Sequence, residues 1–196
     1  ASGALDRRSF ATRDAQGALW FRARLVERVA REARELVLFP REGLREDLER
    51  LNDELKMLVQ QHPVCRRLTA LEGIGPVCSV LLYATLGTGE AFANGRQFSA
   101  YLGLTPKQFS SGGKVNLVGI SKRVANRRLR AVLIQGARAY VYHMKEPKTT
   151  KDRWLWAIIE RSGKCKAAVA LANKNVRTAW AMLTQDTEYQ RYPLAA

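Results

Sequence analysis

The chain has 196 residues, which is enough to bury a core without the help of disulfides or metals. Hydrophobic residues make up 46% of it, but no run approaches the roughly 18 apolar residues of a membrane span, which excludes a transmembrane protein and leaves no membrane partner to expect. The formal net charge is +15, which excludes a surface with equal numbers of positive and negative charges and indicates a polyanionic partner.

The positive charge is concentrated in the second part of the chain. Residues 1–62 hold 12 Lys and Arg against 11 Asp and Glu, whereas residues 63–196 hold 21 against 7. Between Ala91 and Lys145 ten cations occur with no acidic residue. Repulsion of this size destabilises a compact fold unless a polyanion offsets it, and no amphipathic helix typical of membrane surfaces accompanies it. We therefore expect nucleic acid, bound through its phosphates, rather than a basic surface kept for solubility.

The cysteines and histidines indicate no metal site. Cys65, Cys78 and Cys165 are widely spaced, and His62 and His143 complete no zinc pattern with them. We therefore expect buried thiols and no cofactor in this part of the protein. Because no signal segment opens the chain, a cytoplasmic location is expected.

The first third of the chain is predicted to form an arm. Residues 1–17 show no period and are interpreted as a flexible lead. Apolar positions from Ala18 to Phe39 keep a helical spacing, and Pro40 and Gly43 end that pattern. Five leucines then repeat at heptad spacing: Leu44, Leu48, Leu51, Leu55 and Leu58. This pattern predicts a helical hairpin or coiled-coil arm over 18–62, which packs on itself or forms a homo-oligomer, a dimer or tetramer.

A glycine-rich turn follows the arm. Gly73 and Gly75 stand in the run LEGIGP, and Pro76 is well placed as the first residue of a new helix. The segment has the form of a helix-hairpin-helix, whose backbone N–H groups bind a phosphate without reading sequence. The alternative is a tight helix connection that binds nothing.

The middle of the chain contains the serines. A short helix is predicted over Gly95–Leu102, and Gly103–Gly119 is predicted to be a long polar loop, of a length that is usually functional or disordered. This loop contains two serines and two lysines: Ser110, Ser111, Lys107 and Lys114. By itself, the run Ser-Ser-Gly-Gly is more typical of a flexible turn than of an active site.

Asn126 is predicted to cap a helix that runs to about Met144. Cations crowd the first turns of this helix, where they oppose the helix dipole, so a phosphate lying there would offset their cost. The candidate nucleic-acid-binding residues are therefore Gly73, Gly75, Lys107, Lys114, Lys122, Arg123, Arg127, Arg128 and Arg130.

Two more helices complete the expected fold. One is predicted over Arg153–Arg161, with Trp154 and Trp156 as core residues, and the other over roughly Lys164–Thr184. The fold is therefore expected to be mainly α, with little strand: an arm joined to a compact helical domain over 63–196 that carries the serine loop.

Several linked motifs resemble one known family. In order they are GIGP, FANGRQFSAYLGLTPKQFSSGGK, GISKR, LRAVLIQGARA and VALANK. Together they resemble the C-terminal transposase domain of insertion-sequence transposases related to the Piv invertase, the bridge-RNA-guided recombinases. The resemblance runs from about Cys65 to the C-terminus, and residues 18–62 look like the coiled-coil region of that family.

The resemblance implies cleavage and exchange of DNA strands, with a serine nucleophile linked covalently to DNA. Ser111, directly before Gly112, matches the family's serine-glycine better than Ser110 does. It also implies a guide RNA, and an N-terminal RuvC-like domain whose four acidic residues bind a divalent metal, expected to be Mg²⁺. That domain is absent here, so we expect this fragment to be inactive alone.

One local feature departs from the family pattern. Family members have a glycine after ISKR, whereas this chain has Val124 and Ala125 there. The alternative functions are a non-catalytic nucleic-acid-binding module and an oligomerisation scaffold built on the leucine seam.

Overall fold

The computed structural model describes residues 43–111, 114–120 and 124–193. The predicted lead over 1–17 and the predicted helix from Ala18 to Phe39 lie outside these ranges. The described residues are mainly helical, as predicted, and contain one two-stranded sheet. In chain order the elements are α2 Leu44–Gln61, α3 Pro63–Leu68, α4 Pro76–Leu86, α5 Gly95–Tyr101, β1 Pro106–Ser111, β2 Lys114–Ile120, α6 Arg127–His143, α7 Thr150–Ser162 and α8 Lys164–Thr184.

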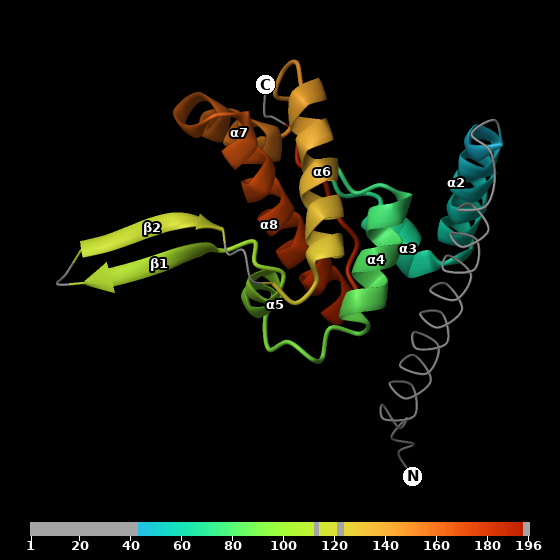
Figure 1. The fold of residues 1–196 in the computed structure, drawn as a ribbon, viewed down its shortest axis with the longest axis horizontal. Helices are drawn as coiled ribbons and strands as arrows, with labels where there is room; N and C mark the ends of the chain where they lie inside the picture. The colour runs from blue at the N-terminus through green and yellow to red at the C-terminus, as the bar shows by residue number, and fades with distance from the viewer. Residues whose placement is uncertain (1–42, 112–113, 121–123, 194–196) are drawn as a thin grey trace, which may run out of the picture.

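Helix α8 is the centre of the helical body, and α5, α6 and α7 pack against it (Figure 1). Its buried face is rich in small residues, which let the neighbouring helices approach closely: Ala167, Ala168, Ala172 and Ala179 are all at most 1% exposed. Larger side chains from the surrounding helices, including Phe98, Leu133 and Leu155, complete one continuous core. The predicted helix over roughly Lys164–Thr184 is therefore confirmed.

The glycines of the LEGIGP turn serve close packing. Gly73 has a positive φ of 77°, and a Cβ atom on it would lie 2.8 Å from the carbonyl oxygen of Gly136 in α6. A Cβ on Gly136 would in turn overlap with the carbonyl oxygen of Gly73. Two backbones thus touch where neither residue tolerates a side chain.

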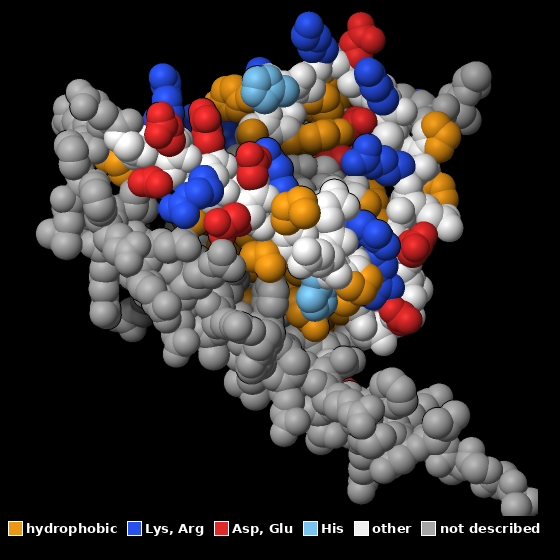
Figure 2. Space-filling view, turned by 90° about the vertical axis from the view of Figure 1, so that its right-hand side faces the viewer, with side chains coloured by type: hydrophobic (Ala, Val, Ile, Leu, Met, Phe, Trp, Pro, Cys, Tyr) orange, Lys and Arg blue, Asp and Glu red, His pale blue; other side chains and the backbone are white. Residues whose placement is uncertain are grey.

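Helix α2 lies at one end of the molecule, and its last turn packs on α3 and α4. Val59, Cys65 and Val80 form a small second cluster there, with Leu55 against it. Leu48 remains 55% exposed, so it has no extensive packing partner among the residues that the structure describes. The helix over the leucine seam is confirmed, whereas the coiled coil and the oligomer stay predictions. Figure 2 shows the face on this side, where Asp and Glu are interspersed with Lys and Arg.

The predicted loop over Gly103–Gly119 is wrong, because the chain forms an antiparallel hairpin there. Strands β1 and β2 pair in a register that places Ser111 opposite Lys114 and Lys107 opposite Val118. The strands make few contacts with the helices, and the hairpin projects from the body on the side away from α2 (Figure 1). The signal was in the sequence: two runs able to form strands are separated by the pair Gly112-Gly113, which is typical of a two-residue hairpin turn.

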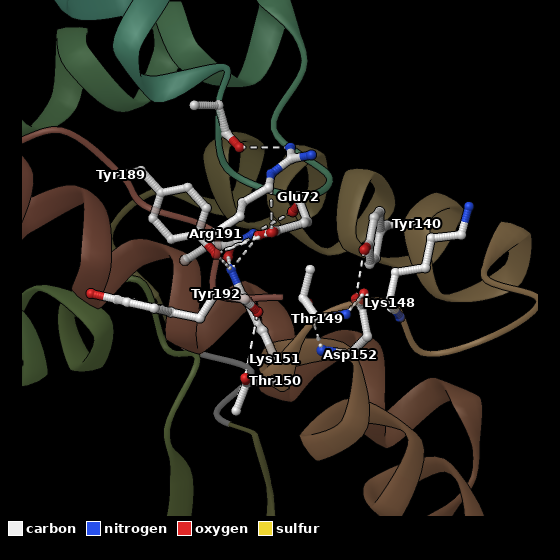
Figure 3. A network of polar contacts seen from close by, with 12 residues as sticks. Glu72, Tyr140, Lys148, Thr149, Thr150, Lys151, Asp152, Tyr189, Arg191 and Tyr192 are labelled. Atoms are coloured by element: carbon white, nitrogen blue, oxygen red, sulfur yellow. Dashed lines mark hydrogen bonds and ion pairs between the residues drawn. The ribbon is translucent and has the colours of Figure 1, made fainter. Parts of the chain in front are cut away.

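A network of polar contacts ties the C-terminal segment to the body (Figure 3). The buried Glu72 carboxylate accepts hydrogen bonds from Lys151 Nζ at 2.6 Å and from the Tyr189 hydroxyl at 2.9 and 3.0 Å. Asn175 of α8 donates to the Glu72 backbone carbonyl at 2.7 Å. Burial lowers the pKa of Lys151, although its ion pair with Glu72 opposes that shift. The acidic residue of the turn motif therefore holds several elements together.

A second part of the same network begins α7. Thr149 and Asp152 form a capping box, and the Tyr140 hydroxyl donates to Asp152 Oδ1 at 2.6 Å. Burial acts to raise the pKa of Asp152, but the hydrogen bonds from Tyr140, Thr149 and the Lys148 backbone outweigh it and lower that pKa.

The prediction that all three thiols are buried is wrong for one of them. Cys65 and Cys78 are buried, whereas Cys165, near the start of α8, is exposed. Burial raises the pKa of both buried thiols to about 12, so almost none of either is thiolate at pH 8.

We expect a disulfide reagent at pH 8 to modify one thiol of the native chain quickly and the other two only after unfolding. Spectrophotometric titration with and without denaturant measures both phases, and Cys165→Ser should remove the fast one. Rapid modification of two or more thiols in the native chain would contradict the burial of Cys65 and Cys78.

None of the helices in the described ranges combines the length and the hydropathy that a membrane span requires.

Candidate nucleic-acid interface

The candidate serines lie at the end of the projecting hairpin. Ser110 and Ser111 are the last residues of β1, and the backbone register puts Ser111 opposite Lys114 across the tip. Seven residues of β2 span about 20 Å at roughly 3.3 Å per residue, so the serines stand well away from the helical body. An isolated two-stranded hairpin is only marginally stable in water, which suggests that another surface or a nucleic acid covers this one.

The predicted cations near the hairpin base and on α6 are accessible. Lys107, Arg127 and Arg128 are exposed, and none of the three has a carboxylate partner among the described residues. Asn126 caps α6 as predicted, with its side chain accepting a hydrogen bond from the Leu129 N–H at 2.9 Å. Arg130 belongs to the first turn of α6, and its side chain reaches the turn after α5. A Cβ atom on Gly103 in that turn would be 3.0 Å from Arg130 Nη1. Lys122 and Arg123 lie outside the described residues.

The two glycines of the turn before α4 differ in exposure. Gly75 is exposed and precedes Pro76 at the start of α4, but Gly73 is half-buried against α6. Both glycines therefore stay candidate phosphate contacts, and close packing on α6 is a second reason for a glycine at position 73.

A groove of about 1310 Å³ runs along the outer face of α8. The start of α5 and the base of the hairpin, at Pro106, Gly119 and Ile120, form one side of it, and Trp154 of α7 also lines it. Four cations line the groove: Arg96, Lys166, Lys174 and Arg177. None of its described lining residues is Asp or Glu. The groove thus combines an apolar floor with uncompensated positive charge.

Trp154 was predicted to be a core residue. That prediction is wrong, because Trp154 lines the groove. Trp154 is 36% exposed, and the buried member of α7 is its neighbour Leu155. The Lys174 ammonium lies 4.3 Å from the centre of the Trp154 ring in a cation–π contact. Trp156 is half-buried, with its indole N–H donating to Glu160 at 2.9 Å.

The groove cations were not among the candidate residues predicted from the sequence, although the helical spacing of those on α8 indicates that they share one face. Lys166, Lys174 and Arg177 fall on one face of α8, opposite its buried stripe. No local pattern indicates that α5 and the hairpin base border that face, because these segments lie 46 to 81 positions away in the chain, counted from Ile120 to Lys166 and from Arg96 to Arg177.

The comparisons with known proteins agree with the resemblance of the motifs. Residues 65–153 match the Transposase IS116/IS110/IS902 family. The transposase for insertion sequence element IS1111A of Coxiella burnetii is 44% identical over 138 residues, covering 70% of this chain and 38% of that protein. A probable family 20 transposase of Pseudomonas aeruginosa is 41% identical over 143 residues, covering 73% and 42%. The transposase for insertion sequence element IS1328 of Yersinia enterocolitica is 36% identical over 146 residues, covering 74% and 43%.

This chain is similar to that family over residues 65–153, which run from α3 through the turn, the hairpin and α6 to the start of α7. It covers about two fifths of the length of the curated relatives that it matches. The groove cations of α8 lie beyond residues 65–153.

Proposed function

We propose that this chain is the DNA-binding and strand-cleaving part of an insertion-sequence transposase, with Ser111 as the nucleophile. The observation that carries the proposal is the position of Ser111 at the end of a projecting hairpin, paired with Lys114, in a domain of a transposase family. A serine presented on such an arm can reach a phosphodiester that the helical body could not approach.

The proposed step is an exchange of phosphodiester bonds. The Ser111 oxygen attacks phosphorus and loses its proton to a base, a serine–phosphate bond forms, and the bond from phosphorus to one sugar oxygen breaks. The released sugar oxygen takes up a proton. Nearby cations would stabilise the extra negative charge of the pentavalent centre, and Lys114 is the candidate closest along the chain.

We propose that the general base and any metal ion come from outside the described residues. Among the described residues no three His, Cys, Asp or Glu side chains come together, so these residues do not fit a metal site and no step is assigned to one. We propose that the remainder of the transposase completes the site and holds Mg²⁺. We also propose that the full protein is related to the Piv invertase and the bridge-RNA-guided recombinases, as its motifs indicate, and that it acts as a homo-oligomer guided by an RNA.

The test is to trap the covalent intermediate. The full-length transposase, supplied with Mg²⁺, guide RNA and DNA carrying the element end, should form an adduct that survives denaturation. Mass spectrometry of the digested adduct should find the nucleotide on the peptide that contains Ser111. Cleavage without an adduct at any time would show attack by water, and would leave this domain as a non-catalytic nucleic-acid-binding module.

A further inference from the structure

The groove along α8 has the charge pattern of a nucleic-acid site. Its four cations come from two separate elements, Arg96 from α5 and the others from α8. None of the four has a carboxylate partner among the described residues. Their repulsion destabilises the fold unless an anion lies between them, and a chain of phosphates supplies that anion.

The apolar floor of the groove favours a ligand that presents bases as well as phosphates over one that presents phosphates alone. Small and apolar residues line it between the cations, including Val169, Ala170 and Ala181. Trp154 lines it with an exposed aromatic ring, and the Lys174 ammonium lies over that ring in a cation–π contact. A duplex keeps its bases stacked inside and presents phosphates, whereas a single strand also presents bases to an aromatic ring.

The groove also leads to the hairpin. Pro106 begins β1 and Ile120 ends β2, and both line the groove, so its border is the base of the arm that carries Ser111 at its other end. A strand lying in the groove therefore continues toward the proposed nucleophile.

We propose that this groove binds one DNA strand in single-stranded form, with its phosphates on Arg96, Lys166, Lys174 and Arg177 and one base stacked on Trp154. The choice of DNA rests on the proposed function, but binding itself does not require the chemistry of Ser111.

The first test compares two triple variants with equal loss of charge. The groove variant is Lys166→Gln, Lys174→Gln, Arg177→Gln, and the control is Arg66→Gln, Lys145→Gln, Lys148→Gln, which removes three exposed cations that do not line the groove. Both are made in the Ser111→Ala chain, so failure of the cleavage proposal leaves the measurement intact. Thermal melting of each variant confirms that it folds.

Fluorescence anisotropy with a labelled 20-nucleotide DNA strand, measured between roughly 50 and 200 mM salt, gives the slope of log affinity against log salt. Each lost phosphate contact should reduce the steepness of that slope by about 0.7, so the groove variant should lose about 2 and the control much less. Equal losses in the two variants would show diffuse attraction and overturn the groove.

Two local probes follow the strand in the groove. Trp154→Ala should weaken single-strand binding about tenfold and Trp154→Phe should restore most of it, because stacking needs an aromatic ring. Saturating single-stranded DNA should slow modification of Cys165, which lines the same groove, about tenfold. Absence of protection would overturn the proposal. So would tighter groove-dependent binding of duplex DNA, or of an RNA strand of the same sequence, which would assign the groove to that ligand instead.

Discussion

Replacement of Ser111 with alanine in the full-length transposase should abolish the covalent protein–DNA adduct and reduce strand cleavage by about a thousandfold or more. Removal of a nucleophile eliminates the covalent route, and the remaining groups contribute only binding and charge stabilisation. DNA affinity should change less than about twofold, because one neutral hydroxyl adds little beside the ten cations between Ala91 and Lys145. Denaturing gels measure the adduct, timed quenching measures cleavage, and anisotropy measures binding.

Ser110→Ala is the matched control for this change. Adjacent residues of a strand lie on opposite faces of the sheet, so we expect only one of the two serines to face the scissile phosphate. Ser111 also forms the last backbone pair before the two glycines, where the chain has most freedom to approach DNA closely. Cleavage by Ser110→Ala should stay within about tenfold of the parent protein. An adduct that persists in Ser111→Ala and disappears in Ser110→Ala would transfer the role to Ser110.

Replacement of Glu72 with glutamine should lower the free energy of unfolding by about 3–5 kcal/mol, the usual cost of breaking a buried ion pair. The Glu72 side chain is 2% exposed and that of its partner Lys151 is 9% exposed, so the variant leaves a buried ammonium group without its counterion. The Tyr189 hydroxyl and Arg191, whose Nε lies 3.4 Å from Glu72 Oε1, contact the same carboxylate, and glutamine offers the three donors only one uncharged oxygen. Urea unfolding followed by circular dichroism measures the loss.

The exposed ion pair of Arg67 with Asp186 supplies the control. These side chains are 24% and 87% exposed, so Asp186→Asn should cost less than about 1 kcal/mol, although its contact is as short as that of the buried pair. The double variant Glu72→Leu, Lys151→Met removes both buried charges and should recover part of the stability. Equal losses for Glu72→Gln and Asp186→Asn would mean that burial does not strengthen the dependence on Glu72.

The sequence by itself determined the features that depend on neighbouring residues. The helix over 164–184, the cap at Asn126 and the start of α6 follow from periodicity and local hydrogen bonding, and the structure confirms all three. The serine hairpin could also have been predicted, because paired glycines between two short strand-forming segments are a local pattern typical of a hairpin turn. The motifs that resemble the transposase family are also local, and the match over residues 65–153 agrees with them.

Only the tertiary structure decided which surfaces these elements form together. The phosphate contact of Gly73 stays a prediction, whereas its packing against the backbone of Gly136, more than 60 positions along the chain, could not be predicted from the sequence. Trp154 was predicted to be in the core because it is large and mostly apolar. The rotation of α7 on α8, however, turns Leu155 inward and leaves the Trp154 indole beside Lys174. The groove exists because α5 and the hairpin base fold against one face of α8. Such contacts depend on how whole helices pack, and helical spacing along one segment contains no information about its neighbour in space.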